Sequence, residues 1–228
     1  MKAVLFDLDD TLYPEIDFVR SGFRAVARYL TSRYNLDEDS LYRQMLVLLQ
    51  EEGRGKVFNR LLDSLDLCTE ERVKLLVYLY RAHIPTIRLY EDVLPILEHL
   101  RSRQIRLGIV TDGMASVQRR KITALGLNEL FDALICTDEL GQEFWKPSPI
   151  PFKVALALLG MCPSESVYVG NDPAKDFGGP NEIGMVTIRV DRCYQGEVLQ
   201  NSGGTPSCAK WIVGGLKDIL PFIRVKGA

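Results

Sequence analysis

The sequence predicts an α/β protein, a Rossmann-like parallel sheet with helices on both faces and a four-helix domain inserted near its start. Three observations lead to this prediction. An apolar run over residues 2–6 ends at Asp7 and is typical of a buried strand. Residues 14–84 carry helical periodicity without a strand signal. After Pro85, strand and helix patterns alternate, which is typical of a parallel sheet.

The helical block follows the first strand directly. Its apolar residues recur at helical spacing in four groups, with breaks near residues 34–37, 52–56 and 68–69. The groups are Phe18, Phe23, Val26 and Leu30; Leu41, Met45, Leu48 and Leu49; Val57, Leu61, Leu62 and Leu65; and Val73, Leu76, Leu79 and Tyr80. Because the first strand has to pair with strands beyond residue 100, the block is an insertion. We therefore expect a core formed by residues 1–13 and 86–228 and a helical bundle formed by residues 14–85.

The part after Pro85 supplies the rest of the sheet. Helices are expected over residues 91–103, 115–125, 149–159 and 174–183, and strands over residues 105–110, 133–136, 167–169 and 186–190. Residues 195–210 are polar and rich in glycine and serine, which predicts a loop. Residues 211–213 are expected to add an edge strand, and residues 216–223 a last helix.

Composition excludes several classes of protein. The 228 residues include 28 Lys and Arg against 30 Asp and Glu, a net charge of −2, whereas a nucleic-acid-binding protein carries an excess of basic residues. We find no apolar run long enough for a membrane span or a signal peptide. The five cysteines are odd in number and lack C-x-x-C spacing, which is typical of free thiols. We therefore expect a cytoplasmic protein.

Two carboxylates follow the first strand. Asp7 and Asp9 belong to the sequence Asp7-Leu8-Asp9-Asp10-Thr11, at the carboxyl end of a strand, where parallel sheets bind their ligands. Like charges at close range repel each other unless a cation or a shared proton holds them. The pair therefore indicates a metal site, although an Asp at the end of a strand can also simply cap a turn.

Later strand ends carry polar residues as well. Thr111-Asp112-Gly113 places a hydroxyl beside a glycine turn, through which backbone N–H groups can approach a phosphate. Lys146-Pro147 offers one positive charge. The segment Gly170-Asn171-Asp172-Pro173 continues to Asp176 and adds two carboxylates. Four acidic side chains at one sheet edge predict a hard cation such as Mg²⁺.

Four polar motifs, in this order and each after a strand, resemble those of the haloacid dehalogenase (HAD) superfamily of hydrolases. They are Asp7-Leu8-Asp9-Asp10-Thr11, Thr111-Asp112-Gly113, Lys146-Pro147 and the segment from Gly170 to Asp176. The resemblance covers nearly the whole chain, and the inserted helices resemble the C1-type cap of that superfamily. One detail differs, since many members have Gly-Asp-Asn-Pro where this chain has Gly170-Asn171-Asp172-Pro173. We assign the metal-binding role to Asp172.

The resemblance implies a Mg²⁺-dependent phosphatase. Asp7 is expected to be the nucleophile that forms an aspartyl-phosphate, and Asp9 the general acid and base, with Thr11 supporting their loop. The implied phosphate-binding residues are Thr111, Asp112, Gly113 and Lys146. The implied metal ligands are Asp7, Asp9 through its backbone carbonyl, and Asp172, with Asp176 as an outer or water-mediated partner.

The implied substrate is a small phosphorylated metabolite, since a cap that closes over the core suits small molecules. A sugar phosphate, a nucleoside monophosphate and phosphoglycolate are all compatible with the pattern. The protein is expected to be a monomer or homodimer with no nucleic-acid or membrane partner. Two rival interpretations stay open, a phosphosugar mutase of the same superfamily and a catalytically silent phosphate-binding regulatory protein.

Two basic segments have weaker assignments. Arg54 and Lys56 lie in a flexible break between the expected cap helices and are candidate specificity residues, although a solvated turn between helices is the favoured explanation. Arg119-Arg120-Lys121 is predicted to be an exposed helix face.

Overall fold

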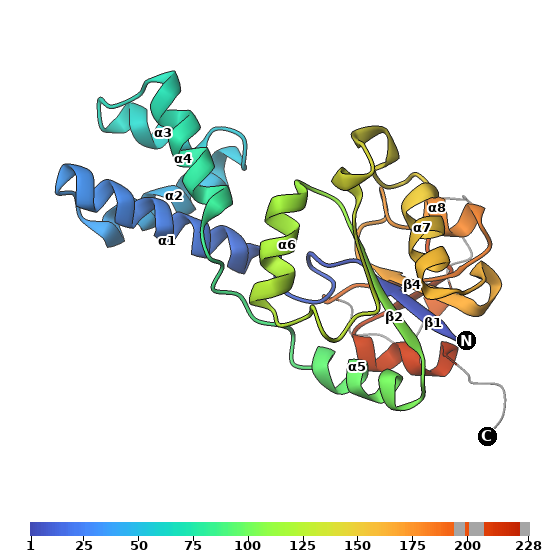
Figure 1. The fold of residues 1–228 in the computed structure, drawn as a ribbon. Helices are drawn as coiled ribbons and strands as arrows, with labels where there is room; N and C mark the ends of the chain where they lie inside the picture. The colour runs from blue at the N-terminus through green and yellow to red at the C-terminus, as the bar shows by residue number, and fades with distance from the viewer. Residues whose placement is uncertain (194–198, 201–207, 224–228) are drawn as a thin grey trace. The chain divides into compact units, whose positions relative to one another are not determined.

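The computed structural model describes residues 1–193, 199–200 and 208–223, and the chain divides into two compact units. One unit consists of Met1–Pro14 with Arg88–Ala228, and the other is Glu15–Ile87. The first unit contains the sheet, and the second is helical (Figure 1). The predicted α/β class with a parallel sheet is confirmed.

The sheet has seven strands within the described ranges, in the order β3-β2-β1-β4-β5-β7-β6. Their bounds are β1 Ala3–Phe6, β2 Arg106–Thr111, β3 Ala133–Cys136, β4 Ser166–Gly170, β5 Val186–Val190, β6 Leu199–Gln200 and β7 Trp211–Val213. Every neighbouring pair is parallel except β6 with β7. The prediction that residues 211–213 form the edge was wrong, because β6 pairs along their outer side. The rest of the loop expected over residues 195–210 lies mostly outside the described residues.

β1 lies near the middle of the sheet, and all four of its residues are fully buried. A strand covered on both faces has no polar side to show, which explains its unbroken apolar run. In the register of the sheet, Phe6 pairs with Ile109 of β2 and with Val169 of β4. The residues that follow β1, β2 and β4 therefore emerge at the same edge.

Helices cover both faces of this sheet. Figure 1 shows α7 and α8 on one face and α5, with a late 3₁₀ helix, on the other. The bounds are α5 Val93–Ser102, α6 Ala115–Ala124, α7 Ile150–Leu159 and α8 Gly178–Glu182, with 3₁₀ helices at Thr137–Glu139, Gln142–Phe144, Pro163–Glu165 and Leu216–Phe222. The last helix expected over residues 216–223 is thus a 3₁₀ helix, and it contains Pro221.

α8 is shorter than predicted and begins at Gly178 instead of residue 174. The preceding residues form a turn held by side chains. Asp176 accepts the backbone N–H groups of residues 171–172, and Asp172 accepts the N–H of Ala174 at 2.9 Å. Because these carboxylates bond locally to the backbone, the chain turns where helical periodicity had predicted a helix.

The helical unit packs around its own core. It contains α1 Glu15–Tyr34, α2 Glu38–Glu52, α3 Val57–Ser64 and α4 Glu70–Ala82, so the four predicted helices are present. Side-chain oxygens cap two helix starts, where Asp37 accepts from the N–H of Ser40 at 2.6 Å and Thr69 from that of Arg72 at 3.3 Å. Residues of three helices, such as Val26, Met45 and Leu61, are fully buried in this unit.

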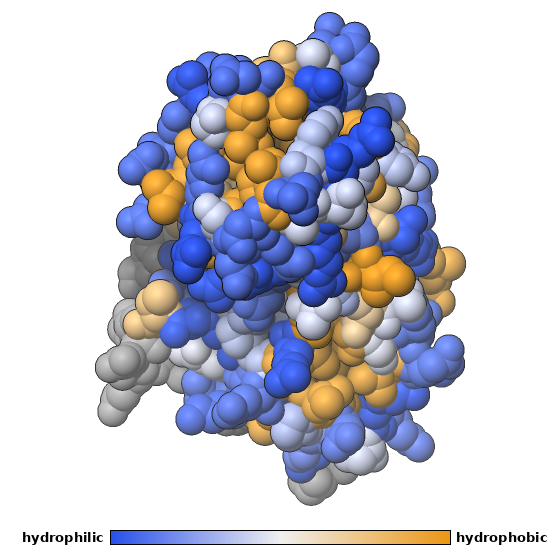
Figure 2. Space-filling model, turned by 90° about the vertical axis from the view of Figure 1, so that its left-hand side faces the viewer, coloured by the Kyte–Doolittle hydropathy of each residue, from blue (hydrophilic) through white to orange (hydrophobic). Residues whose placement is uncertain are grey.

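Apolar residues also reach the surface. Figure 2 shows them as separate groups among hydrophilic residues on the face in view. The most exposed large apolar side chains that the structure describes are Val47, Tyr78, Ile84, Leu94, Met114 and Leu158. Within residues 1–193, 199–200 and 208–223, none of the helices combines the length and apolar character needed to cross a membrane.

Candidate active site

Asp7 follows β1 directly. Its N–H donates to the carbonyl of Val169 in β4 at 2.9 Å, which extends the parallel pairing by one residue. The chain then turns at Asp10, whose φ of 55° lies in the left-handed region that Asp tolerates better than most residues. The turn is closed by the N–H of Asp10, which donates to the carbonyl of Tyr13 at 2.9 Å. Asp7 and Asp9 are thereby placed just beyond the end of the sheet.

A buried lysine holds the Asp7 carboxylate. Lys146 Nζ lies 2.6 Å from Asp7 Oδ1, 2.7 Å from Asp176 Oδ1 and 3.2 Å from the Tyr168 hydroxyl. Burial opposes the charge on Lys146, but Asp176 and Asp7 outweigh that effect and raise its pKa well above the ordinary value. Lys146 is therefore a fixed cation between two carboxylates.

Asp176 bonds to the protein through both carboxylate oxygens. Oδ1 accepts from Lys146 and from the Tyr168 hydroxyl at 2.9 Å, and Oδ2 accepts the backbone N–H groups of residues 171–172 at 3.0 and 2.8 Å. Gly170 leaves the necessary room, because a Cβ there would lie 2.5 Å from Asp176 Oδ2. Burial opposes ionisation of Asp176, but Lys146 and these donors lower its pKa. Asp176 thus orients Lys146 and the turn after β4.

Burial is the largest influence on Asp7. Burial raises the pKa of this carboxyl, Lys146 lowers it, and the nearby charges of Asp176 and Asp9 raise it; together these effects bring it to about 7. A carboxylate in this setting is stabilised by additional positive charge. Oδ2, the oxygen opposite the one that Lys146 contacts, lies 3.4 Å from Thr11 Oγ1. The electrostatics of Asp7 thus fit a cation on the Oδ2 side.

Three donors hold the Asp9 carboxylate. Lys121 Nζ lies 2.7 Å from Oδ1, the Tyr13 hydroxyl donates to the same oxygen, and Gln118 Nε2 donates to Oδ2 at 2.8 Å. Gln118 Nε2 also donates to Thr111 Oγ1 at 2.6 Å. Burial opposes ionisation of Asp9, but Lys121, Tyr13 and Gln118 lower its pKa below the ordinary range. Asp9 is an ionised, oriented carboxylate in this structure.

The prediction of an exposed Arg119-Arg120-Lys121 face was wrong at Lys121, which is 4% exposed. The helix period explains the error, because α6 buries Val117, Gln118, Lys121 and Ile122 along one stripe and turns Arg119 and Arg120 outward. The charge run in the sequence concealed this stripe. Tyr168 was also missed, since it lies inside the buried strand β4, where a polar tip gives no periodic signal.

The turn after β2 carries the predicted phosphate-binding residues. Thr111 ends the strand and is 1% exposed. The Asp112 carboxylate faces the protein, where Oδ1 accepts from the Thr137 hydroxyl at 2.7 Å and from the backbone N–H of Lys146 at 3.2 Å. Gly113 has a φ of 112°, which favours glycine. Asp112 therefore joins the loops that carry Thr111 and Lys146, and only its backbone is left for a phosphate.

The structure places Asn171, the residue before the predicted Asp172, beside Thr11, which also contacts Asp7. Thr11 Oγ1 lies 3.3 Å from Asn171 Oδ1 and 3.4 Å from Asp7 Oδ2, so the amide oxygen and the carboxylate share one neighbour. The Asp172 carboxylate instead accepts the N–H of Ala174 and lies 3.7 Å from Lys175 Nζ, with 37% of its side chain exposed. The Asp172 side chain thus bonds within its own turn, to the backbone two residues further on.

The four aspartates predicted to surround a metal all have donors from the protein itself. The described ranges contain no group of three or more His, Cys, Asp or Glu side chains arranged to hold a metal. Asp9 is bonded to α6, Asp176 is buried among protein donors, and Asp172 caps its own turn. The oxygens near Thr11, from Asp7 and Asn171, fit Mg²⁺, which takes few protein ligands and keeps several waters.

In the helical unit, Arg54 forms an ion pair. Its two terminal nitrogens lie 2.8 and 2.7 Å from the carboxylate oxygens of Glu15, and its side chain is 60% exposed. Lys56 precedes α3 and is exposed. Their assignment as specificity residues stays a prediction.

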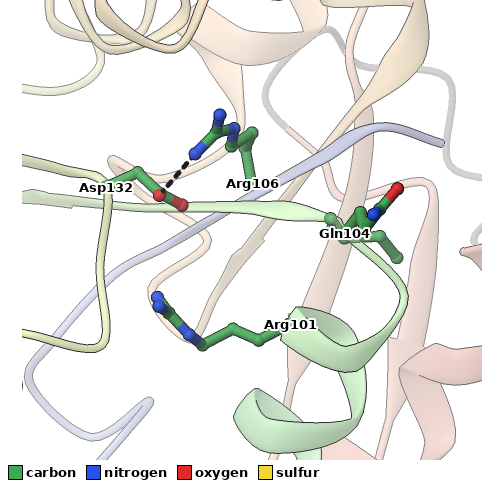
Figure 3. Close-up of a pocket in the computed structure, with 5 residues that line it drawn as sticks. Arg101, Gln104, Arg106 and Asp132 are labelled. Carbon is green, nitrogen blue, oxygen red and sulfur yellow. Dashed lines mark hydrogen bonds and ion pairs between the residues drawn. The ribbon is translucent and has the colours of Figure 1, made fainter.

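A pocket of about 450 Å³ lies elsewhere, near the amino end of β2. It is lined by Arg101, Gln104, Ile105, Arg106 and Asp132. In Figure 3 Arg106 reaches Asp132, to which it donates at 2.9 Å, while Arg101 donates to the carbonyl of Leu130 at 2.6 Å. Ligands of parallel sheets bind at the opposite, carboxyl end, so this pocket is not the candidate active site.

Comparison with known proteins identifies a family. The profile of the haloacid dehalogenase-like hydrolases matches residues 4–190. The chain is 35% identical over 214 residues to a glyceraldehyde 3-phosphate phosphatase of Methanopyrus kandleri, covering 90% of this chain and 91% of the relative. It is 30% identical over 195 residues to a protein of the same name from Methanocaldococcus jannaschii, covering 83% and 85% of the two chains.

A solved structure agrees with these sequence relatives. The HAD phosphatase of Thermococcus onnurineus superimposes with a TM-score of 0.61 and 26% identity, covering 98% of each chain. The similarity thus extends over both units of the chain.

Proposed function

The chain belongs to the haloacid dehalogenase-like hydrolases, and from this premise we propose that it is a Mg²⁺-dependent phosphatase that transfers the phosphoryl group of a small phosphomonoester to Asp7. One observation carries the proposal: Asp7 is a buried carboxylate with one oxygen fixed by Lys146 and the other beside Thr11 and Asn171. The names of the relatives support phosphatase chemistry. The substrate in these names makes glyceraldehyde 3-phosphate the first compound to test.

In this proposal, each residue of the site has a separate role in the two steps of the reaction. An Asp7 oxygen attacks phosphorus as the bond to the leaving oxygen breaks, and Asp9, which has to take up a proton from solvent before this step, gives that proton to the leaving oxygen. Water then attacks the aspartyl-phosphate, Asp9 takes a proton from it, and phosphate leaves. Thr111 and the backbone around Gly113 hold phosphate oxygens, while Lys146 offsets charge and keeps Asp7 in place.

Mg²⁺ would be held by Asp7, the backbone carbonyl of Asp9, and Asn171 in place of Asp172. When bound, it supplies positive charge that stabilises the transferring phosphoryl group. Asp176 acts on this site through Lys146 and the turn after β4. We further propose that the helical unit Glu15–Ile87 acts as a cap and that Arg54 and Lys56 contribute to substrate choice.

The function is tested by phosphate release from a panel of phosphomonoesters. The panel contains glyceraldehyde 3-phosphate, phosphoglycolate, sugar phosphates and nucleoside monophosphates, each with Mg²⁺ and with a chelator. We expect release with Mg²⁺ and its loss with chelator, reversed by added Mg²⁺. Activity that needs a sugar bisphosphate and releases no phosphate would identify a mutase. No turnover of any ester would identify a silent phosphate-binding protein.

The metal ligand is tested by exchanging the two residues of the turn. Asn171→Asp should tighten Mg²⁺ binding by about tenfold, since a carboxylate binds Mg²⁺ more strongly than an amide. The matched change Asp172→Asn should alter it by less than about twofold, because that side chain caps its own turn. Calorimetric titration with Mg²⁺ measures both. Weak binding in Asp172→Asn with unchanged binding in Asn171→Asp would restore Asp172 as the ligand.

A further inference from the structure

α6 presents two polar side chains on its buried stripe. Gln118 and Lys121 lie one helical turn apart and are 2% and 4% exposed. Their neighbours Val117 and Ile122 pack into the core in the usual way. A buried lysine is costly unless its charge has a partner, and the partner here is Asp9.

The two side chains bind different oxygens of the Asp9 carboxylate. Lys121 Nζ holds Oδ1 at 2.7 Å, and Gln118 Nε2 holds Oδ2 at 2.8 Å, so each carboxylate oxygen has a donor from α6. Tyr13 also donates to Oδ1, so what distinguishes Lys121 among the three donors is its charge, and hydrogen bonds between charged partners are the stronger ones. Gln118 also donates to Thr111 at 2.6 Å. The proposed acid and the proposed phosphate-binding hydroxyl therefore share one support.

The other two basic residues of α6 do not contact Asp9 through a hydrogen bond or ion pair that the structure gives, and both lie on the surface. Arg119, next to Lys121 in the sequence, forms an ion pair with Glu139 on the surface. Arg120 is exposed. The basic run thus supplies one cation to the site and leaves two outside, and Arg120 provides a control for removing a charge from the same helix.

We propose that Lys121, together with Gln118, is a positioning residue that holds the Asp9 carboxylate in the orientation needed to protonate the leaving oxygen and to accept a proton from water. The proposal rests on the proposed function. It goes further by naming the helix that orients Asp9.

The test uses two esters that differ in their need for a proton. An alkyl phosphomonoester needs protonation of its leaving oxygen, whereas 2,4-dinitrophenyl phosphate has a leaving group that departs as an anion. For Lys121→Met we expect kcat/KM to fall by about 30-fold with the alkyl ester and by less than about threefold with the aryl ester. kcat/KM reports only the steps up to phosphoryl transfer to Asp7, so later steps do not confuse the comparison.

The second half of the reaction gives an independent readout. With Asp9 misplaced as a base, hydrolysis of the aspartyl-phosphate becomes slow. Rapid mixing of Lys121→Met with 2,4-dinitrophenyl phosphate should then show a burst of dinitrophenolate followed by a slower steady rate. Lys121→Arg should recover part of both losses, and Arg120→Met should match the unmodified protein.

A double-mutant cycle separates positioning from general damage to the fold. In an Asp9→Asn background, Lys121→Met should cost less than about threefold in kcat/KM, because the group that it positions is already gone. Equal losses on the two esters, or full additivity with Asp9→Asn, would overturn the positioning role. If the unmodified protein hydrolyses no ester with Mg²⁺, the proposed function fails instead, and the two failures are distinguishable.

Discussion

Asp7→Asn is expected to lower kcat for every phosphomonoester by at least about 1,000-fold, because an amide cannot form the aspartyl-phosphate. The protein should stay folded. Burial and the nearby carboxylates already raise the pKa of Asp7 to about 7, so a neutral side chain suits this position, and Lys146 keeps its contact with Asp176. Phosphate release gives the rate, and thermal unfolding in chelator reports the fold.

The matched control lies on the same loop. Asp10→Asn makes the same chemical change three residues away, at a φ of 55° that asparagine also tolerates. The kcat of this variant should lie within about threefold of that of the unmodified protein, since Asp10 has no proposed role. Acid quenching during turnover should trap a phosphorylated protein with Asp10→Asn and none with Asp7→Asn. Full activity in Asp7→Asn would remove the nucleophile from the proposal.

Lys146→Met is expected to lower the free energy of unfolding by about 3–5 kcal/mol, measured in chelator. The reason is the burial of its partners. The Lys146 side chain and that of Asp176 are fully buried, and that of Asp7 is 5% exposed, so removal of the cation leaves two buried carboxyl groups without a counter-ion. The same change should abolish phosphate release, because Asp7 loses its fixed orientation.

A second variant separates stability from activity. Lys146→Met combined with Asp176→Asn removes one of the unpaired charges and should recover part of the lost stability without recovering activity. The control Lys175→Met removes a half-exposed lysine at 3.7 Å from Asp172 and should change stability by less than about 0.5 kcal/mol. If Lys146→Met unfolds at the same denaturant concentration as the unmodified protein, the buried cation is not what stabilises this edge of the sheet.

The architecture could be predicted from the sequence because its main signals are local. The run at β1 is apolar throughout since both faces of that strand are covered, and the four helices of the second unit show their periodicity plainly. The site was only partly predictable. Asp7 and Lys146 follow recognisable patterns, but their contact depends on chain segments 139 residues apart.

Several features escaped prediction for physical reasons, of which three concern the site and the turn beside it. Lys121 lies in a charged run, which concealed the buried stripe of α6 to which it belongs. Asn171 and Asp172 are adjacent polar residues, and the sequence does not show that Asn171 contacts Thr11 while Asp172 accepts the N–H of Ala174. The start of α8 depends on Asp176. Its side chain accepts the backbone N–H groups of residues 171–172, so this segment forms a turn and not the first turn of a helix.

The stripe on α6 has a consequence for recognising this arrangement in other chains. Gln118 and Lys121 follow Thr111 by seven and ten positions, and both intervals are set by the distance from the end of β2 to successive turns of one helix. A hydroxyl residue, a glutamine and a lysine at these intervals therefore form a signature that can be searched for without coordinates. Related hydrolases with an apolar residue at the lysine position must orient their acid by other means. Grafting the pair into such a chain would show whether the support is transferable.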